Sequence, residues 1–143
     1  MKVSIIVPVY NEEESIGLLY EAVEKSVNTM GIPWELILVD DGSKDHSRAK
    51  IEEIVKKHKG QVSAVILRRN FGQTAAIAAG IDNSSGDIIV LLDADLQNDP
   101  ADIPLMVSKL SEGNDLVSGW RHRRKDKNLT RTLPSQIANS LIS

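Results

Sequence analysis

The sequence predicts an α/β protein with a mostly parallel, doubly wound sheet covered by helices on both faces. Short apolar runs rich in β-branched residues recur along the chain, and longer segments with helical apolar spacing separate them. The runs are nearly continuous rather than alternating, as in strands that are buried on both sides. Because strand and helix alternate at least four times, right-handed βαβ units in a three-layer α/β/α arrangement are expected.

The first half of the chain supplies two pairs of strand and helix. A strand is expected over residues 3–9 (VSIIVPV), followed by a helix over 13–28 in which apolar residues recur every three or four positions. The acids at the start of this helix suit its positive end, and Asn11 is a candidate for its N-cap. A second strand over 35–39 (ELILV) leads through the turn sequence DDGS into a helix over 45–58.

The second half of the chain repeats this pattern. A strand over residues 62–67 (VSAVIL) precedes a helix over 73–83, and a strand over 87–92 (DIIVLL) precedes a helix over 100–112. An Asp-Pro pair marks the start of the last of these helices. A fifth strand is expected over 115–118 (DLVS).

The net charge of −3, from 17 Lys and Arg against 20 Asp and Glu, is unevenly distributed. Residues 1–120 hold 11 basic and 19 acidic side chains, a balance of −8, and residues 121–143 hold 6 basic and one acidic, a balance of +5. The absence of cysteine excludes disulfides, thiolate metal sites and a cysteine nucleophile, and is typical of a reducing compartment. The apolar run at the N-terminus, about seven residues, is too short for a signal peptide or a membrane span.

The charge distribution suggests two parts, an α/β domain over residues 1–120 and a basic segment over 121–143. The last residues have the apolar pattern of an amphipathic helix, and no Gly or Pro ends it. We therefore expect the chain to be the N-terminal part of a longer protein.

Polar residues follow each predicted strand, at the sheet edge where ligands of such folds bind. Asp93 and Asp95 leave the fourth strand two residues apart, so both carboxylates can face one ligand. Two neighbouring carboxylates attract a divalent cation such as Mg²⁺ or Mn²⁺, which completes its shell with water and substrate phosphates, and Gln97 can add a carbonyl oxygen. The alternative, a pair of solvated acids, is less consistent with their place directly after a buried strand.

Two other strand exits carry candidate nucleotide contacts. Asp40 can accept hydrogen bonds from a nucleobase or a ribose, while Ser43 or Asp45 caps the next helix. Tyr10 can stack on a base, and Glu12 or its neighbour can bind the ribose. Helix capping alone would also explain the acids of both exits, and the two roles are compatible.

Arginines at the third and fifth strand exits are suited to bidentate contacts with phosphate. They are Arg68 and Arg121, whereas Arg69 fits better as a solvated charge. The three histidines are not spaced like a metal site, and no glycine-rich dinucleotide or P-loop motif follows any strand. NAD chemistry and P-loop chemistry are therefore disfavoured.

Five segments, PVYNEEES, LVDDGSKD, LRRNFGQTAA, DADLQNDP and LVSGWR, together resemble the family 2 glycosyltransferases of GT-A fold. The resemblance is nearest to the polyprenyl- or dolichyl-phosphate sugar transferases, such as dolichyl-phosphate mannose synthase, and covers essentially the whole chain. It implies that residues 1–120 form the nucleotide-sugar and metal-binding domain. Residues 121–143 would then contain the acceptor loop.

The resemblance also implies roles for single residues. The donor nucleotide would be held by Pro8, Tyr10, Glu12, Asp40, Asn70 and Gln73. Mg²⁺ or Mn²⁺ on the donor diphosphate would be coordinated by Asp93, Asp95 and Gln97. The catalytic residues would be Asp93, Asp95 and Arg121. The acceptor phosphate would be held by Arg131 and Ser135.

The implied reaction is metal-dependent, inverting transfer of a mannose- or glucose-type hexose from a UDP- or GDP-linked sugar to a polyprenyl or dolichyl phosphate. Such an acceptor is already largely dianionic at pH 7, so it needs nearby cations more than a protein base. The basic residues between 121 and 131 can supply them and bind an anionic membrane surface. The full-length protein would act at the cytoplasmic side, peripheral to or anchored in the membrane, whereas residues 1–143 alone would be soluble. We expect no nucleic-acid partner, and self-association stays open.

Other functions remain as alternatives. A family 2 enzyme acting on a saccharide or another hydroxyl acceptor would share the donor site. A nucleotidyltransferase would have a glycine-rich basic loop after the first strand, where this chain has acids. A receiver-type signalling domain would need an Asp after the third strand and a Lys after the fifth, but Arg68 and Trp120 occupy those exits.

Overall fold

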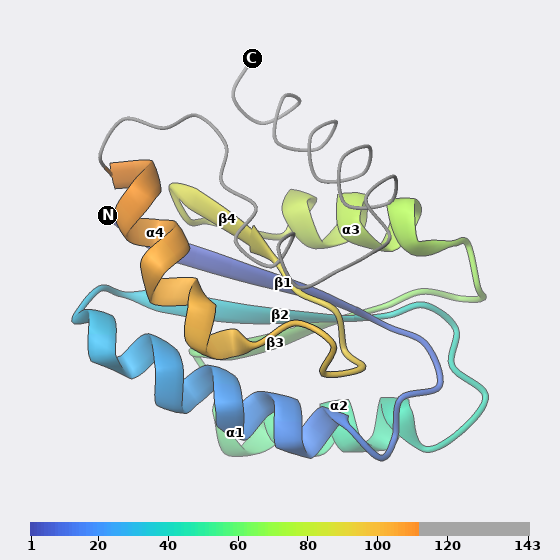
Figure 1. Ribbon diagram of the computed structural model, residues 1–143. Coiled ribbons are helices and arrows are strands. Elements are labelled where there is room, and N and C mark those ends of the chain that lie inside the picture. Colours follow the sequence, from blue (N-terminus) through green and yellow to red (C-terminus); the bar gives the residue numbers. More distant parts are fainter. Residues whose placement is uncertain (112–143) are drawn as a thin grey trace.

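The computed structural model of the protein describes residues 1–111 of the 143 (Figure 1). Its strands are β1 (Val3–Val9), β2 (Trp34–Asp40), β3 (Val62–Ile66) and β4 (Ile88–Leu91). They pair in parallel in the order β3-β2-β1-β4. The predicted parallel α/β fold is therefore confirmed. Because the chain moves outward from β1 to β3 and then crosses back to β4, the order reverses between β1 and β4, where such sheets form a crevice.

Helices cover both faces of the sheet (Figure 1). They are α1 (Ile16–Val27), η1 (Asn28–Met30), α2 (Ser47–Lys57), α3 (Gln73–Asp82), η2 (Pro100–Asp102) and α4 (Ile103–Ser111). Helices α1, α2 and α4 pack on one face and α3 on the other, as the two buried apolar clusters show. Among residues 1–111, no helix is both long and apolar enough to cross a membrane.

The alternation of side chains along β1 divides the core into two layers. Ile5 and Val7 belong to the layer that contains the apolar side chains of α1, while Ile6 packs in the other layer with Ala76 of α3. All three β1 residues are fully buried. The nearly continuous apolar run seen in the sequence is thus the signature of a strand that is covered on both sides.

The observed boundaries differ most from prediction at the start of α1. The helix begins at Ile16, and Asn11 does not cap it. Instead, Asn11 has a left-handed backbone (φ 54°) and its Oδ1 accepts a hydrogen bond from the Lys44 amide at 2.8 Å. The residues before α1 therefore bind the neighbouring strand exit rather than extend the helix.

The last described helix begins as the Asp-Pro pair predicts. Asp99 Oδ1 accepts a hydrogen bond from the Ala101 amide at 2.9 Å, and Pro100 opens the 3₁₀ turn η2, which continues as α4. The predicted strand over 115–118, the division at residue 120 and the basic segment 121–143 lie outside the described residues.

Candidate functional site

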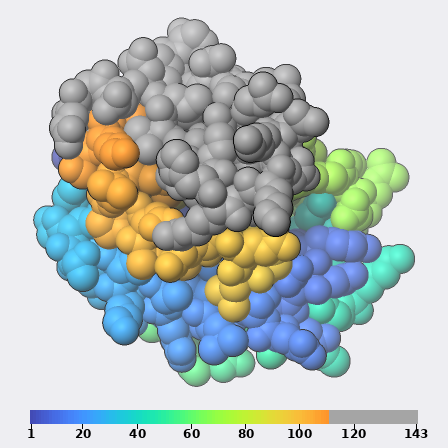
Figure 2. Space-filling view, viewed as in Figure 1, coloured from blue at the N-terminus to red at the C-terminus, as the bar shows by residue number. Residues whose placement is uncertain are grey.

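A cavity of about 510 Å³ lies at the carboxyl ends of the strands. The sequence-predicted residues that line it are Pro8, Tyr10, Glu12, Asn70, Gln73, Asp93, Asp95 and Gln97. The lining residues that were not predicted are Val9, Asp41, Gly72 and Ala94. In Figure 2 the yellow segment after β4 reaches the surface beside the blue segment after β1. The parallel sheet thus brings four separate strand exits to one site.

The cavity wall is acidic. Four of the lining residues are Glu12, Asp41, Asp93 and Asp95, and among the described residues no Lys or Arg joins them. Closely spaced carboxylates repel one another, and a bound cation relieves this repulsion. The described part of the site is therefore suited to a cation, or to an anionic ligand that arrives with one.

Asp93 and Asp95 follow β4 and both line the cavity. Gln73 Nε2 donates to Asp93 Oδ1 at 3.3 Å, and the Gln97 amide donates to Asp95 Oδ1 at 3.1 Å. Between these groups Leu96 has a left-handed backbone, with φ 66°. This turn keeps Gln97 beside Asp95 at the cavity wall.

The donor set fits a hard divalent cation. Asp93, Asp95 and Gln97 offer oxygen ligands, which Mg²⁺ and Mn²⁺ prefer. Within residues 1–111, however, no three His, Cys, Asp or Glu side chains gather closely enough to hold a metal by themselves. A cation here would take its remaining ligands from water and a substrate, as Mg²⁺ commonly does.

At the exit of β2 the structure separates two neighbouring aspartates. Asp40 is buried, and its Oδ1 accepts a hydrogen bond from the Ser43 amide at 3.2 Å, closing the turn. Asp41 is similarly buried, yet it is the aspartate that lines the cavity. Of the DDGS motif, therefore, Asp41 reaches the site and Asp40 holds the turn.

The exits of β1 and β2 are tied together by side-chain to backbone hydrogen bonds. The Asn11 amide donates to Ser43 Oγ at 2.9 Å, and the Glu12 amide donates to Ser47 Oγ at 2.8 Å. Glu12 is also held by Ser15, whose Oγ donates to its Oε2 at 2.9 Å. These bonds fix the backbone that presents Tyr10 and Glu12 to the cavity.

The N-cap of α2 is His46, not the predicted Asp45 or Ser43, and its side chain makes no capping bond. Asp45, one residue earlier, accepts hydrogen bonds from the first amide of α2 and from the segment after β1. Its Oδ1 accepts from the Ser47 amide at 2.8 Å, and its Oδ2 accepts from the Glu13 amide at 3.3 Å. Burial alone would raise the pKa of Asp45, but the hydrogen bonds from Ser47 and Glu13 outweigh it and hold the pKa below its ordinary value. Asp45 thus connects the segment that follows β1 to the start of α2.

The predicted phosphate-binding arginines are not part of the described cavity. Arg68 and Arg69 are exposed, and the Arg69 guanidinium lies 4.8 Å from the centre of the Phe71 ring. Arg121, Arg131 and Ser135 lie outside the described residues.

Sequence comparison places the chain among known transferases. Residues 4–142 match the family model described as Glycosyl transferase family 2. The chain is 48% identical to dodecaprenyl-phosphate galacturonate synthase of Rhizobium johnstonii, covering 99% of this chain and 42% of that protein. It is 45% identical to undecaprenyl-phosphate 4-deoxy-4-formamido-L-arabinose transferase of Proteus mirabilis, covering 99% of this chain and 43% of that protein. The chain thus spans about two fifths of the length of these relatives.

Comparison with solved structures agrees. Glucosyl-3-phosphoglycerate synthase from Mycobacterium tuberculosis, crystallised with Mn²⁺, UDP and phosphoglyceric acid, superposes with a TM-score of 0.59. It is 25% identical, and the match covers 76% of this chain and 38% of that protein. The resemblance predicted from the motifs is thus confirmed, and because the family match covers nearly all of its residues, the chain belongs to glycosyl transferase family 2.

Proposed function

We propose that this chain is the donor-binding part of a glycosyltransferase that moves a sugar from a nucleoside diphosphate to a polyprenyl phosphate. The observation that carries the proposal is the acidic cavity, which four acidic residues line and which no described Lys or Arg joins. The acidic residues that line the cavity would repel a diphosphate unless a cation lay between them and the diphosphate. A nucleotide sugar with Mg²⁺ or Mn²⁺ meets this requirement.

Asp93, Asp95 and Gln97 would hold the cation on the donor diphosphate. A bound divalent cation acts as a Lewis acid that stabilises the negative charge developing on the leaving nucleoside diphosphate. Gln73 restrains Asp93, and the backbone amide of Gln97 restrains Asp95. The two restrained carboxylates would orient the donor through the cation that they hold. The crystal structure of the mycobacterial relative with Mn²⁺ and UDP supports this assignment.

The nucleoside would lie over the exits of β1 and β2. Tyr10 is 40% exposed, which leaves its ring accessible for stacking on a base. The predicted donor residues Pro8, Glu12 and Asn70 share the same wall. At the β2 exit we assign the base or ribose contact to Asp41, because Asp41 lines the cavity and Asp40 does not.

The acceptor assignment rests on the relatives, whose names specify dodecaprenyl and undecaprenyl phosphate. A phosphate monoester is largely dianionic at pH 7 and can attack without a protein base, and attack opposite the leaving group would invert the anomeric centre. Arg121 is proposed to assist catalysis at the phosphate, and Arg131 with Ser135 to hold the acceptor. The basic residues between 121 and 131 would also bring the full-length protein to the cytoplasmic membrane surface.

The sugar is proposed to be a hexose of the mannose or glucose type. Because the relatives named above transfer galacturonate or 4-deoxy-4-formamido-L-arabinose, the donors to compare are UDP-glucose, GDP-mannose, UDP-galacturonate and the UDP-linked formamido sugar. The base of the donor that binds most tightly identifies the nucleotide that the protein uses.

The test is donor binding by the 143-residue chain, measured calorimetrically with and without Mn²⁺. Wild type should bind one donor of the panel in Mn²⁺ and much more weakly in EDTA. Asp95→Asn should weaken Mn²⁺-dependent binding at least about tenfold, since even the loss of an outer-shell partner of a metal ligand costs that much.

The matched control is Asp82→Asn, which makes the same change at an exposed aspartate at the end of α3. It should leave donor affinity unchanged. Donor binding that is equally strong in EDTA, or equal in Asp95→Asn and Asp82→Asn, would contradict the metal-dependent site.

A further inference from the structure

Asp41 ties the exit of β2 to the segment that follows β3. Its Oδ1 accepts a hydrogen bond from the Phe71 amide at 2.8 Å, and its Oδ2 accepts one from the Gly72 amide at 3.1 Å. Both oxygens of one carboxylate therefore hold two consecutive backbone amides. Hydrogen bonds to an ionised acceptor are shorter and stronger than neutral ones. Asp41 is only 3% exposed, so water competes little for these bonds.

These bonds begin where the strand pairing ends. The last paired residues of β2 and β3 are Asp40 and Ile66, and the Leu67 amide donates to the Asp40 carbonyl at 2.9 Å. Beyond this point the backbone ladder between β2 and β3 ends, and hydrogen bonds to the Asp41 side chain take its place. They continue the connection between the two exits as far as Gly72.

Gly42 brings the same two segments into direct contact. A Cβ at this position would lie 2.3 Å from the Arg69 carbonyl carbon and 2.4 Å from the Asn70 amide nitrogen. The backbone of residues 69–70 thus rests on the backbone of Gly42, with no room for a side chain. Gly42 sets how closely the segment approaches, and Asp41 sets how its amides are oriented.

The segment held in this way forms part of the cavity wall. Asn70, Gly72 and Gln73 line the cavity, and Gln73 restrains the candidate metal ligand Asp93. Phe71, whose amide Asp41 holds, is itself half exposed and contributes no buried anchor. Gly72 has φ 105°, so the chain turns sharply just before α3 begins. The orientation of Asn70 toward the cavity therefore depends on contacts made by its neighbours.

We propose that Asp41 is a positioning residue for the donor site. Its carboxylate fixes the amides of Phe71 and Gly72, and this holds residues 70–73 in the shape that presents Asn70 to the donor. The role is additional to any contact between Asp41 and the nucleotide, and it rests on the proposed function for the identity of the ligand. It predicts that Asp41 and Asn70 act as one unit, coupled through the backbone of the segment.

The first test needs no ligand. Amide hydrogen exchange is measured by NMR in wild type and in Asp41→Asn, which keeps the size of the side chain but removes its charge and one acceptor oxygen. Exchange at Phe71 and Gly72 should accelerate at least about tenfold, as expected for the loss of hydrogen bonds to a charged group. Exchange in β1 should not change, because the core is not touched.

The matched control is Asp40→Asn, an identical substitution at the adjacent buried carboxylate. It should accelerate exchange at Ser43, whose amide Asp40 holds, and leave Phe71 and Gly72 unchanged. Unchanged exchange at Phe71 and Gly72 in Asp41→Asn, or equal acceleration in both variants, overturns the proposal. If Asp41→Asn does not fold, exchange at the Phe71 and Gly72 amides of the wild-type protein is the test. Exchange as fast as in an unstructured peptide overturns the proposal, and strong protection supports it.

The second test is a double-mutant cycle on donor affinity, with UDP-glucose and GDP-mannose as probes in Mn²⁺. Asn70→Ala should weaken binding in the wild-type background and have little further effect in Asp41→Asn, where Asn70 is already displaced. Additive losses overturn the proposal. Absence of donor binding by wild type would count against the proposed function, while the exchange experiment would still decide the role of Asp41.

Discussion

Gly42 and Gly60 are two glycines with similar backbones and different surroundings. Both have positive φ, 73° for Gly42 and 89° for Gly60, a conformation that residues with a Cβ rarely adopt. A Cβ at Gly60 would meet nothing within 4 Å, whereas one at Gly42 would collide with backbone atoms of Arg69 and Asn70. Comparing the two separates backbone strain from steric exclusion at the donor site.

We expect Gly42→Ala to lower the free energy of unfolding more than Gly60→Ala does. Left-handed strain alone costs about 1–3 kcal/mol, and Gly60→Ala should fall in this range. Gly42→Ala adds the displacement of residues 69–70 from the β2 exit. Urea denaturation of both variants measures the difference, and equal losses of stability would show that the close approach at Gly42 is easily relieved.

The contrast between Asp40 and Asp41 shows the limit of sequence reasoning at the scale of a residue. Of the two adjacent aspartates at the β2 exit, Asp40 is the predicted nucleotide contact, whereas Asp41 is the one that lines the cavity. Which aspartate reaches the cavity depends on the turn at Gly42 and on where the segment after β3 lies, which are tertiary features. Asn11 is similar, because its left-handed backbone serves a contact with Lys44 rather than the predicted helix cap.

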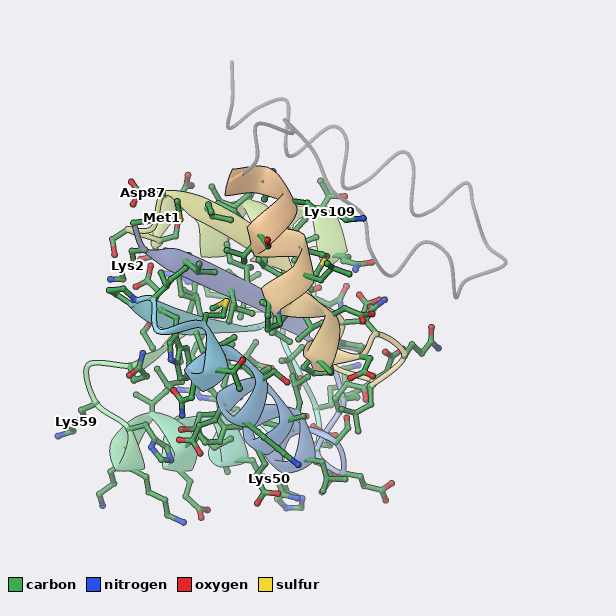
Figure 3. The ribbon with its side chains drawn as sticks, turned by 60° about the vertical axis from the view of Figure 1, so that its left-hand side comes forward. Met1, Lys2, Lys50, Lys59, Asp87 and Lys109 are labelled. Carbon is green, nitrogen blue, oxygen red and sulfur yellow. The ribbon has the colours of Figure 1, made fainter. Side chains whose placement is uncertain are left out.

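At the scale of elements, a polar cluster closes the end of the sheet opposite the cavity. Glu35 of β2 accepts hydrogen bonds at Oε2 from the buried Ser4 hydroxyl of β1 at 2.5 Å and from the Ser85 amide at 2.7 Å. Lys2 Nζ lies 3.5 Å from Glu35 Oε1, and its backbone amide donates to Asp87. Figure 3 shows Lys2 and Asp87 together at this end of the molecule. The cluster fastens the loop before β4 to β1 and β2.

This cluster predicts a dependence of stability on pH. Burial alone would raise the pKa of Glu35, but the hydrogen bonds from Ser4 and Ser85 and the Lys2 ammonium outweigh it, so the pKa lies below its ordinary value of 4.5. A carboxylate with a lowered pKa stabilises the folded state above the unfolded-state pKa, and this contribution is lost as the pH falls through the folded-state pKa. The difference in stability between wild type and Glu35→Gln should therefore be largest near neutral pH and shrink below pH 4.5.

Urea denaturation at a series of pH values measures this difference. The control is Glu53→Gln, which removes the same charge from an exposed i,i+4 pair with Lys57 and should have little effect at any pH. A constant gap between wild type and Glu35→Gln from neutral to acid pH would mean that the contribution of Glu35 does not come from its ionised form.

The elements themselves were largely predictable, because burial on both faces leaves a clear pattern in the sequence. The four described strands fall within one residue of the predicted ranges at every end. The β3-β2-β1-β4 order was beyond the sequence, since it depends on which strands pair rather than on where they begin. The start of α1 was placed three residues too early, because the segment before it is used instead to contact α2 and its turn.

For the whole molecule, the uneven distribution of charge matches the proposed roles of its two parts, with donor binding in residues 1–120 and acceptor binding in residues 121–143. The acidic balance of residues 1–120 includes the carboxylates of the cavity, which suit a cation and a nucleotide sugar. The balance of +5 over residues 121–143 suits an acceptor phosphate and an anionic lipid surface.

The basic segment predicts salt-dependent binding to vesicles of phosphatidylglycerol and phosphatidylcholine. Replacing Arg123, Arg124 and Lys125 by Glu should weaken binding by on the order of 1 kcal/mol for each cation removed. The effect should fade at high salt, because ions screen the attraction between exposed charges and the lipid surface. Sedimentation with vesicles at several salt concentrations measures both effects.

The control is a second triple variant, in which Glu replaces Lys56, Lys57 and Lys59 at the end of α2. It changes the net charge by the same amount, and all three side chains are exposed. Figure 3 shows Lys59 pointing outward there, at the other end of the helix from Lys50. This end of α2 lies away from the carboxyl ends of the strands, since the helix runs back from the β2 exit to the start of β3. If net charge alone drove association, both triple variants would bind vesicles equally weakly. Loss of binding in the 123–125 variant alone would assign the membrane contact to the basic segment, and undiminished binding in that variant would contradict it.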